Sequence, residues 1–137
     1  MFKLFFTSLI ALSFLSCSDS AIVTRYNEKA LTTPIPCMRL ELSPFNIVTM
    51  HTLQNLYSFD EKCNYSLTLS QKSAIVCNSS FNSDKKALTK FPTSYLSFTL
   101  KKGSELLYSY YVDLSDDVEE SDIKRGFKRL REDIKLK

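Results

Sequence analysis

The chain has 137 residues, of which 44% are apolar, 24% charged and 12% aromatic. This composition is typical of one small globular domain, and it excludes a disordered tail, a collagen-like chain and an array of domains. Two glycines leave little room for a Gly-rich phosphate loop, and no Walker or dinucleotide-binding motif is present. A net charge of +3 is too small to indicate nucleic-acid binding without a clustered basic face.

Residues 1–16 are predicted to be a signal peptide. Lys3 supplies the positive charge, and residues 4–15 form an apolar run that only three hydroxyl residues interrupt. A helix needs about 20 residues to cross a hydrocarbon core of roughly 30 Å, so this run is too short for a permanent span. Its length and flanks are those of a secretory leader.

The leader ends in Phe14-Leu15-Ser16-Cys17. This tetrapeptide resembles the lipobox of bacterial lipoproteins, although that family prefers Leu at the first position and a small residue at the second. The resemblance implies that Cys17 receives a diacylglyceryl group on its thiol, becomes the first residue after cleavage, and is then acylated on its amino group, for example with palmitate. The alternative is ordinary secretion, with cleavage near Ser18 or Ser20 and no lipid.

A triacylated Cys17 would anchor the protein stably, since one acyl chain binds membranes only marginally and a second makes the binding durable. By resemblance to Gram-negative lipoproteins, Ser18 rather than Asp after the cysteine favours the periplasmic side of the outer membrane, with the inner membrane as the alternative. The lipid bilayer is therefore the first expected partner.

Residues 17–36 are predicted to be the lipidated cysteine and an extended tether. Small and polar residues lead to Thr33-Pro34-Ile35-Pro36, where proline removes donors and favours extended backbone. Residues 37–137 are predicted to be a single globular domain with a modest core.

Alternating apolar residues predict a first strand over residues 38–42, which Pro44 ends. Residues 45–59 leave two alternatives. Apolar residues at helical spacing favour a helix, whereas the β-branched start Ile47-Val48-Thr49 would also suit a strand. We favour the helix.

Two hairpins follow. Residues 63–69 alternate and, after a polar tip at residues 70–72, continue on the same face to Cys77 if Ser66 pairs with Ala74. The second hairpin joins residues 95–100 to residues 105–114 through a turn at 101–104, in which Gly103 supplies the left-handed position.

The last segment predicts an amphipathic helix. Asp116 and Glu119 have the spacing of a capping box. Apolar residues then recur on one helical face, at Ile123, Phe127, Leu130 and Ile134. The predicted fold is α+β: a mainly antiparallel sheet of about five strands, with the C-terminal helix packed on one face.

An oxidising periplasm permits one disulfide among the three cysteines that remain once Cys17 carries lipid. The hairpin register favours Cys63–Cys77, and the alternative pairs Cys37 with either of them. The C-x-x-C spacing of a redox or zinc site is absent, so we expect no metal and no cofactor.

Three tyrosines on one predicted strand are the candidate binding residues. Tyr108 and Tyr110 should share one face while Tyr111 points to the other, so at least one should reach solvent or a partner. The lone His51 has no nucleophile signature beside it. The acidic run, Asp113, Asp116, Asp117, Glu119 and Glu120, lacks the ligand order of an EF-hand and fits helix capping better.

These features predict a non-catalytic periplasmic lipoprotein that acts as a binding or scaffold subunit of an envelope assembly. The partners expected are the bilayer, through acylated Cys17, and an envelope protein; no small-molecule substrate is expected. The alternative function is an inhibitor or immunity-type lipoprotein that blocks a periplasmic enzyme or toxin.

Overall fold

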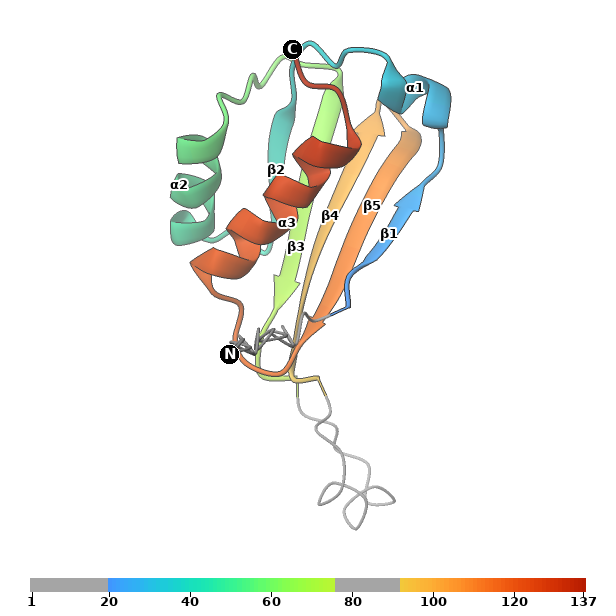
Figure 1. The fold of residues 1–137 in the computed structure, drawn as a ribbon. Coiled ribbons are helices and arrows are strands. Elements are labelled where there is room, and N and C mark those ends of the chain that lie inside the picture. Colours follow the sequence, from blue (N-terminus) through green and yellow to red (C-terminus); the bar gives the residue numbers. More distant parts are fainter. Residues whose placement is uncertain (1–19, 76–91) are drawn as a thin grey trace, which may run out of the picture.

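The computed structural model describes residues 20–75 and 92–137, which form a five-stranded sheet and three helices (Figure 1). In chain order the elements are β1 Ile22–Arg25, α1 Glu28–Thr32, β2 Arg39–Ser43, α2 Ile47–Leu56, β3 Tyr65–Lys72, β4 Ser94–Lys102, β5 Glu105–Leu114 and α3 Glu120–Asp133. The strand order is β1-β5-β4-β3-β2, with β2 and β3 parallel and all other pairs antiparallel. The predicted α+β class is confirmed.

The core lies between α3 and one face of the sheet. Phe98 on β4 and Tyr110 on β5 stand on that face, directly opposite each other, and Phe127 of α3 packs against Phe98. Gly126 lets the helix approach so closely, because a Cβ there would lie 2.6 Å from Phe98 Cε2. A glycine that costs helix propensity is thus explained by packing.

The predicted apolar face of the last helix is confirmed, because all four of its residues are buried: Ile123, Phe127, Leu130 and Ile134. The predicted capping box is wrong, because it lies one helical turn too early in the chain. The capping box joins Glu119 to Asp122, whose carboxylate accepts the Glu119 N–H, and not Asp116 to Glu119. Val118 packs against the core before the helix begins, so residues 115–118 serve as the connection from β5.

The second predicted hairpin is also confirmed. Gly103 has φ +59° in the turn, and the strands extend further toward it than expected, so that Lys102 already pairs with Glu105. A short loop between antiparallel strands depends only on residues close together in the chain, and a suitable turn residue is enough to form it.

The first predicted hairpin is wrong. Residues 70–72 are not a tip but the end of β3, which pairs with β4 on one side and with β2 on the other. Ser66 lies opposite Lys101 rather than Ala74. Alternation identified the strand and its buried face, but not its neighbour, since any strand with a matching apolar face satisfies the same pattern.

The parallel pair β2 and β3 is joined by the helix that the sequence favoured for residues 45–59. Parallel neighbours need a long crossover, and α2 provides it. Asn46 caps α2, because its Oδ1 accepts from the N–H groups of Val48 and Thr49 at 2.9 and 3.1 Å. The strand predicted over residues 38–42 is confirmed as β2, shifted by one residue.

The extended tether predicted for residues 17–36 is corrected from residue 22 onward. There β1 adds an edge strand to β5, and α1 follows. Leu31 and Ile35 are completely buried or nearly so, and Ile35 forms a β-bridge with Leu136 beside the C-terminus. Pro34 and Pro36 do keep this segment extended. The side chain of Ile35 between them is nevertheless buried in the core, and composition alone could not reveal this.

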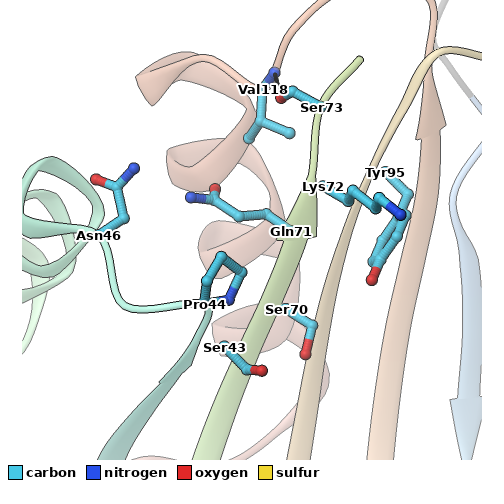
Figure 2. Close-up of a pocket in the computed structure, with 9 residues that line it drawn as sticks. All are labelled: Ser43, Pro44, Asn46, Ser70, Gln71, Lys72, Ser73, Tyr95 and Val118. Carbon is cyan, nitrogen blue, oxygen red and sulfur yellow. Dashed lines mark hydrogen bonds between the residues drawn. The ribbon is translucent and has the colours of Figure 1, made fainter. Parts of the chain in front are cut away.

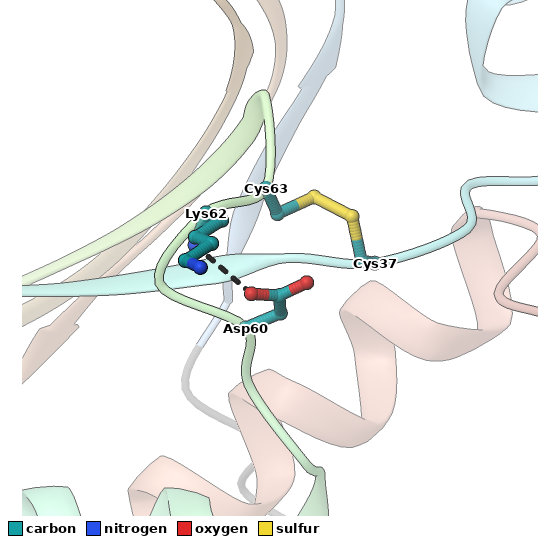
Figure 3. Close-up of a disulfide and its surroundings, with 4 residues drawn as sticks. All are labelled: Cys37, Asp60, Lys62 and Cys63. Atoms are coloured by element: carbon teal, nitrogen blue, oxygen red, sulfur yellow. Dashed lines mark hydrogen bonds between the residues drawn. A yellow bond between two sulfur atoms is a disulfide. The ribbon is translucent and has the colours of Figure 1, made fainter.

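The disulfide joins Cys37 to Cys63 and not Cys63 to Cys77 (Figure 3). Because β3 does not turn back at residues 70–72, the register that set Cys63 opposite Cys77 does not exist. The bond instead links the residues just before the parallel strands β2 and β3, and the turn at Asp60–Cys63 carries Cys63 to it. The alternative with Cys37 is therefore the one observed; Cys77 lies outside the described residues.

Candidate functional site

The three candidate tyrosines separate as the strand alternation predicted, but only one of them is accessible. Tyr108 and Tyr110 are buried in the core, with exposures of 0% and 3%. Tyr111 points to the opposite face and is 37% exposed. The binding role predicted for Tyr108 and Tyr110 is therefore wrong, since a buried ring cannot contact a partner.

Tyr108 has a structural role at the centre of a charged cluster. Its hydroxyl donates to Asp133 Oδ2 at 2.9 Å. The same carboxylate accepts from Arg25 on β1 at 3.0 Å and from Arg129 on α3 at 2.9 Å. Burial alone would raise the pKa of Asp133, but these three donors outweigh it and lower that pKa below its usual value. The cluster ties α3 to β5 and to the edge strand β1.

We expect the cluster to make stability depend on pH in the acid range. Because the pKa of Asp133 is lower in the folded state, its contribution is present above the carboxyl's ordinary pKa of about 4 and is lost as the pH falls through the folded value. Asp133→Asn should reduce the free energy of unfolding by about 2 kcal/mol at pH 7. Urea titrations at pH 7 and pH 3 measure this. A loss of equal size at both pH values would contradict the ionic role.

No described helix covers the second face of the sheet, and small hydroxyl side chains dominate it. Tyr111 there lies opposite Ser97, which lies opposite Ser70 on β3. The next row contains Ser109, Thr99 and Thr68. Short side chains of this kind leave the backbone surface flat and rich in hydrogen-bonding groups.

One aromatic pair rises from this face. Tyr95 stacks on Tyr111, with ring centroids 5.7 Å apart and planes at 21°. The Tyr111 hydroxyl donates to Asp113 at 2.7 Å, and this hydrogen bond, together with burial, raises the pKa of Tyr111. The ring is therefore held rigidly while part of it stays open to solvent, which suits a contact residue because little conformational entropy is lost on binding.

A polar cavity of about 490 Å³ lies where β2 and β3 end and α2 begins (Figure 2). Ser43 and Ser70 contribute hydroxyls from the two strands, Asn46 comes from the helix cap, and Lys72 brings the one charge. Tyr95 also reaches this cavity, which therefore adjoins the open face of the sheet.

Gln71 lines the cavity and links β3 to α2. Its Nε2 donates to Thr49 on α2 at 3.1 Å, whereas its buried Oε1 has no partner among the described atoms. A buried amide oxygen without a donor is uncommon, and water or a ligand would normally satisfy it. The sequence does not predict this cavity, because its pattern predicts a hairpin tip at residues 70–72 and the strand pairing that assembles the cavity is nonlocal.

The structure also places the histidine and the acidic run that the sequence analysis weighed. His51 is exposed on α2. The acidic run is spread over the end of β5 and the start of α3, and residues 20–75 and 92–137 contain no cluster suited to a metal ion. No helix in the described residues is long and apolar enough to cross a membrane. Cys17 lies outside the described residues.

Comparison of the chain with protein-family models, with curated proteins and with solved structures gives no match.

Proposed function

We propose that the chain is a lipid-anchored, non-catalytic binding subunit of an envelope assembly, held through Cys17 on the periplasmic side of the outer membrane. The lipobox-like Phe14-Leu15-Ser16-Cys17 and the short leader before it support the anchor. An oxidising compartment agrees with the bond between Cys37 and Cys63.

The uncovered face of the sheet carries the binding part of the proposal. Antiparallel sheets commonly leave one face open to solvent, and exposed tyrosines are enriched in protein interfaces. Tyr111 is the only tyrosine of the three candidates that combines exposure with a fixed position, which it owes to Tyr95 and Asp113. The protein partner is therefore proposed to contact this face around Tyr111.

Photo-crosslinking in intact cells tests both parts. A benzoylphenylalanine is placed at position 111, or at position 26 as the control, since Tyr26 is also exposed but follows β1 at the far end of that strand. Each is expressed with Cys17 intact and with Cys17→Ala. We expect one discrete adduct with an envelope protein from position 111 only. Cys17→Ala should release the protein into the soluble fraction and remove most of the adduct, because the anchor raises the local concentration of partners.

Three outcomes would decide against parts of the proposal. Unchanged membrane retention of Cys17→Ala contradicts the anchor. Equal adducts from positions 111 and 26 contradict the binding face. An adduct with an incoming hydrolase or toxin, rather than with a resident envelope protein, favours the inhibitor function.

A further inference from the structure

At one end of the domain the described chain begins, and several strands and helices begin or end. β1 begins there at Ile22, β3 ends there and α3 begins there, toward the lower end of the molecule in Figure 1. β2 ends beside β3, and α2 begins just after it, higher in that view. The antiparallel and parallel registers require this arrangement, since Ile22 lies opposite Tyr111 near the end of β5 and Ser43 lies beside Ser70 near the end of β3.

This end also carries most of the exposed apolar side chains. Tyr111 lies beside this end on the open face of the sheet, opposite Ile22. Of the other five large exposed apolar residues in the described chain, four are here: Ile22 at 65% exposure, Phe45 at 69%, Ile47 at 52% and Val48 at 63%. Three of the four are grouped at the start of α2, next to Pro44 and the polar cavity. Single exposed apolar residues are ordinary, but a group at one end of a small domain marks a contact surface.

The covalent chain places this end close to Cys17. Cys17 precedes Ser20, the first described residue, by three positions, and an extended chain advances at most about 3.6 Å per residue. Cys17 therefore lies within about 11 Å of Ser20. Had residues 17–36 formed a tether, as the composition suggested, the domain could have stood tens of ångströms from a bilayer; with β1 beginning at Ile22 it cannot.

We propose that this end of the domain rests on the lipid bilayer, with Phe45, Ile47 and Val48 inserted at the boundary between head groups and acyl chains. The proposal rests on the lipidation of Cys17 and adds to it a fixed orientation of the domain. Ile22 contacts the surface beside the anchor, and the polar cavity, which adjoins Phe45 through Pro44 and Asn46, lies at the level of the head groups. β1 and β2 are the opposite edges of the sheet. Apolar contacts beside both edges, at Ile22 and at the start of α2, therefore hold the domain in one orientation on the bilayer.

The charges at this end select the kind of lipid. Among the described residues, Asp116, Asp117, Glu119 and Glu120 are exposed just before or at the start of α3. Two lysines offset them in part, since Lys72 lies at the end of β3 and Lys124 pairs with Glu120. An anionic surface repels such an excess of carboxylates. The surface expected is therefore zwitterionic, such as phosphatidylethanolamine or phosphatidylcholine.

The chain contains no tryptophan, so one introduced indole reports its own depth. Phe45→Trp places it in the proposed contact, and Tyr26→Trp is the matched control at an exposed aromatic position beyond β1. Each acylated full-length mature protein is reconstituted in phosphatidylcholine vesicles with brominated acyl chains. We expect at least threefold stronger quenching for Phe45→Trp than for Tyr26→Trp. Replacing half the lipid with phosphatidylglycerol should reduce that difference.

Intact mass of the same samples separates the two proposals. If Cys17 is acylated and both variants are quenched equally, the docked orientation is overturned while the anchor stands. If Cys17 carries no lipid, the anchor fails, and the orientation fails with it. Adding Val48→Asp to Phe45→Trp supplies a second check: reduced quenching with an unchanged melting temperature supports insertion, and unchanged quenching overturns it.

Discussion

Phe127→Asp should unfold the domain. The Phe127 ring is 1% exposed and contacts Tyr57, Phe59 and Phe98, so it joins α3 both to the sheet and to the segment after α2. Truncating a buried phenylalanine costs about 3–5 kcal/mol, and placing an unpaired carboxylate there adds several more. The sum is comparable to the whole stability of a small domain. Circular dichroism should show a chain without a cooperative thermal transition.

Two matched variants separate this effect from a general intolerance of substitution. Phe45→Asp makes the same chemical change at a side chain that is 69% exposed, and it should change the free energy of unfolding by less than about 0.5 kcal/mol. Phe127→Leu keeps the site apolar and should cost about 1–2 kcal/mol. A folded, monomeric Phe127→Asp protein would show that α3 is peripheral to the core.

Loss of the Cys37–Cys63 bond should produce the second large effect. The two cysteines lie 26 positions apart, and the loop between them includes β2 and α2; the chain-entropy estimate for closing such a loop is roughly 3–4 kcal/mol. The double variant Cys37→Ala/Cys63→Ala should lower the free energy of unfolding in urea by about that amount. Because β2 is an edge strand held by β3 alone, the loss should appear first as faster amide exchange in β2.

Cys77→Ala is the control that distinguishes the two pairings. With the observed bond, this variant keeps its disulfide and its stability, and intact mass shows two hydrogen atoms fewer than the fully reduced chain. A bridge between Cys63 and Cys77 would reverse the result: Cys77→Ala would lose the stability, and Cys37→Ala would keep it.

The elements predicted correctly are those whose signals are local. Apolar residues spaced along one helical face determine α3 regardless of what covers it, and Gly103 between two alternating segments determines the β4–β5 hairpin. The one error in α3 was its first turn. Several acidic residues precede the helix, and only the packing of Val118 against the core decides which of them caps it.

The wrong predictions concern which strands pair with each other and which cysteines bond. The pattern of residues 63–69 identified a strand with one buried face, but the choice between a return at residues 70–72 and a continued strand depends on β4, whose first residue is 94. The disulfide prediction inherited that error, because it used the register of a hairpin that does not form. The cavity at Gln71 and the open face around Tyr111 depend on the same pairings.

By itself, the amino-acid sequence determined the α+β class, the hairpin at Gly103 and the buried face of the last helix, because each depends on residues within a few positions of one another. Only the tertiary structure decided which strand neighbours β3, that Cys63 bonds Cys37, and that residues 22–36 belong to the domain. These depend on burying one apolar surface against another far away in the chain. Ile35 shows the reason most directly, since a residue between two prolines is fully buried only because the C-terminal segment at Leu136 lies beside it.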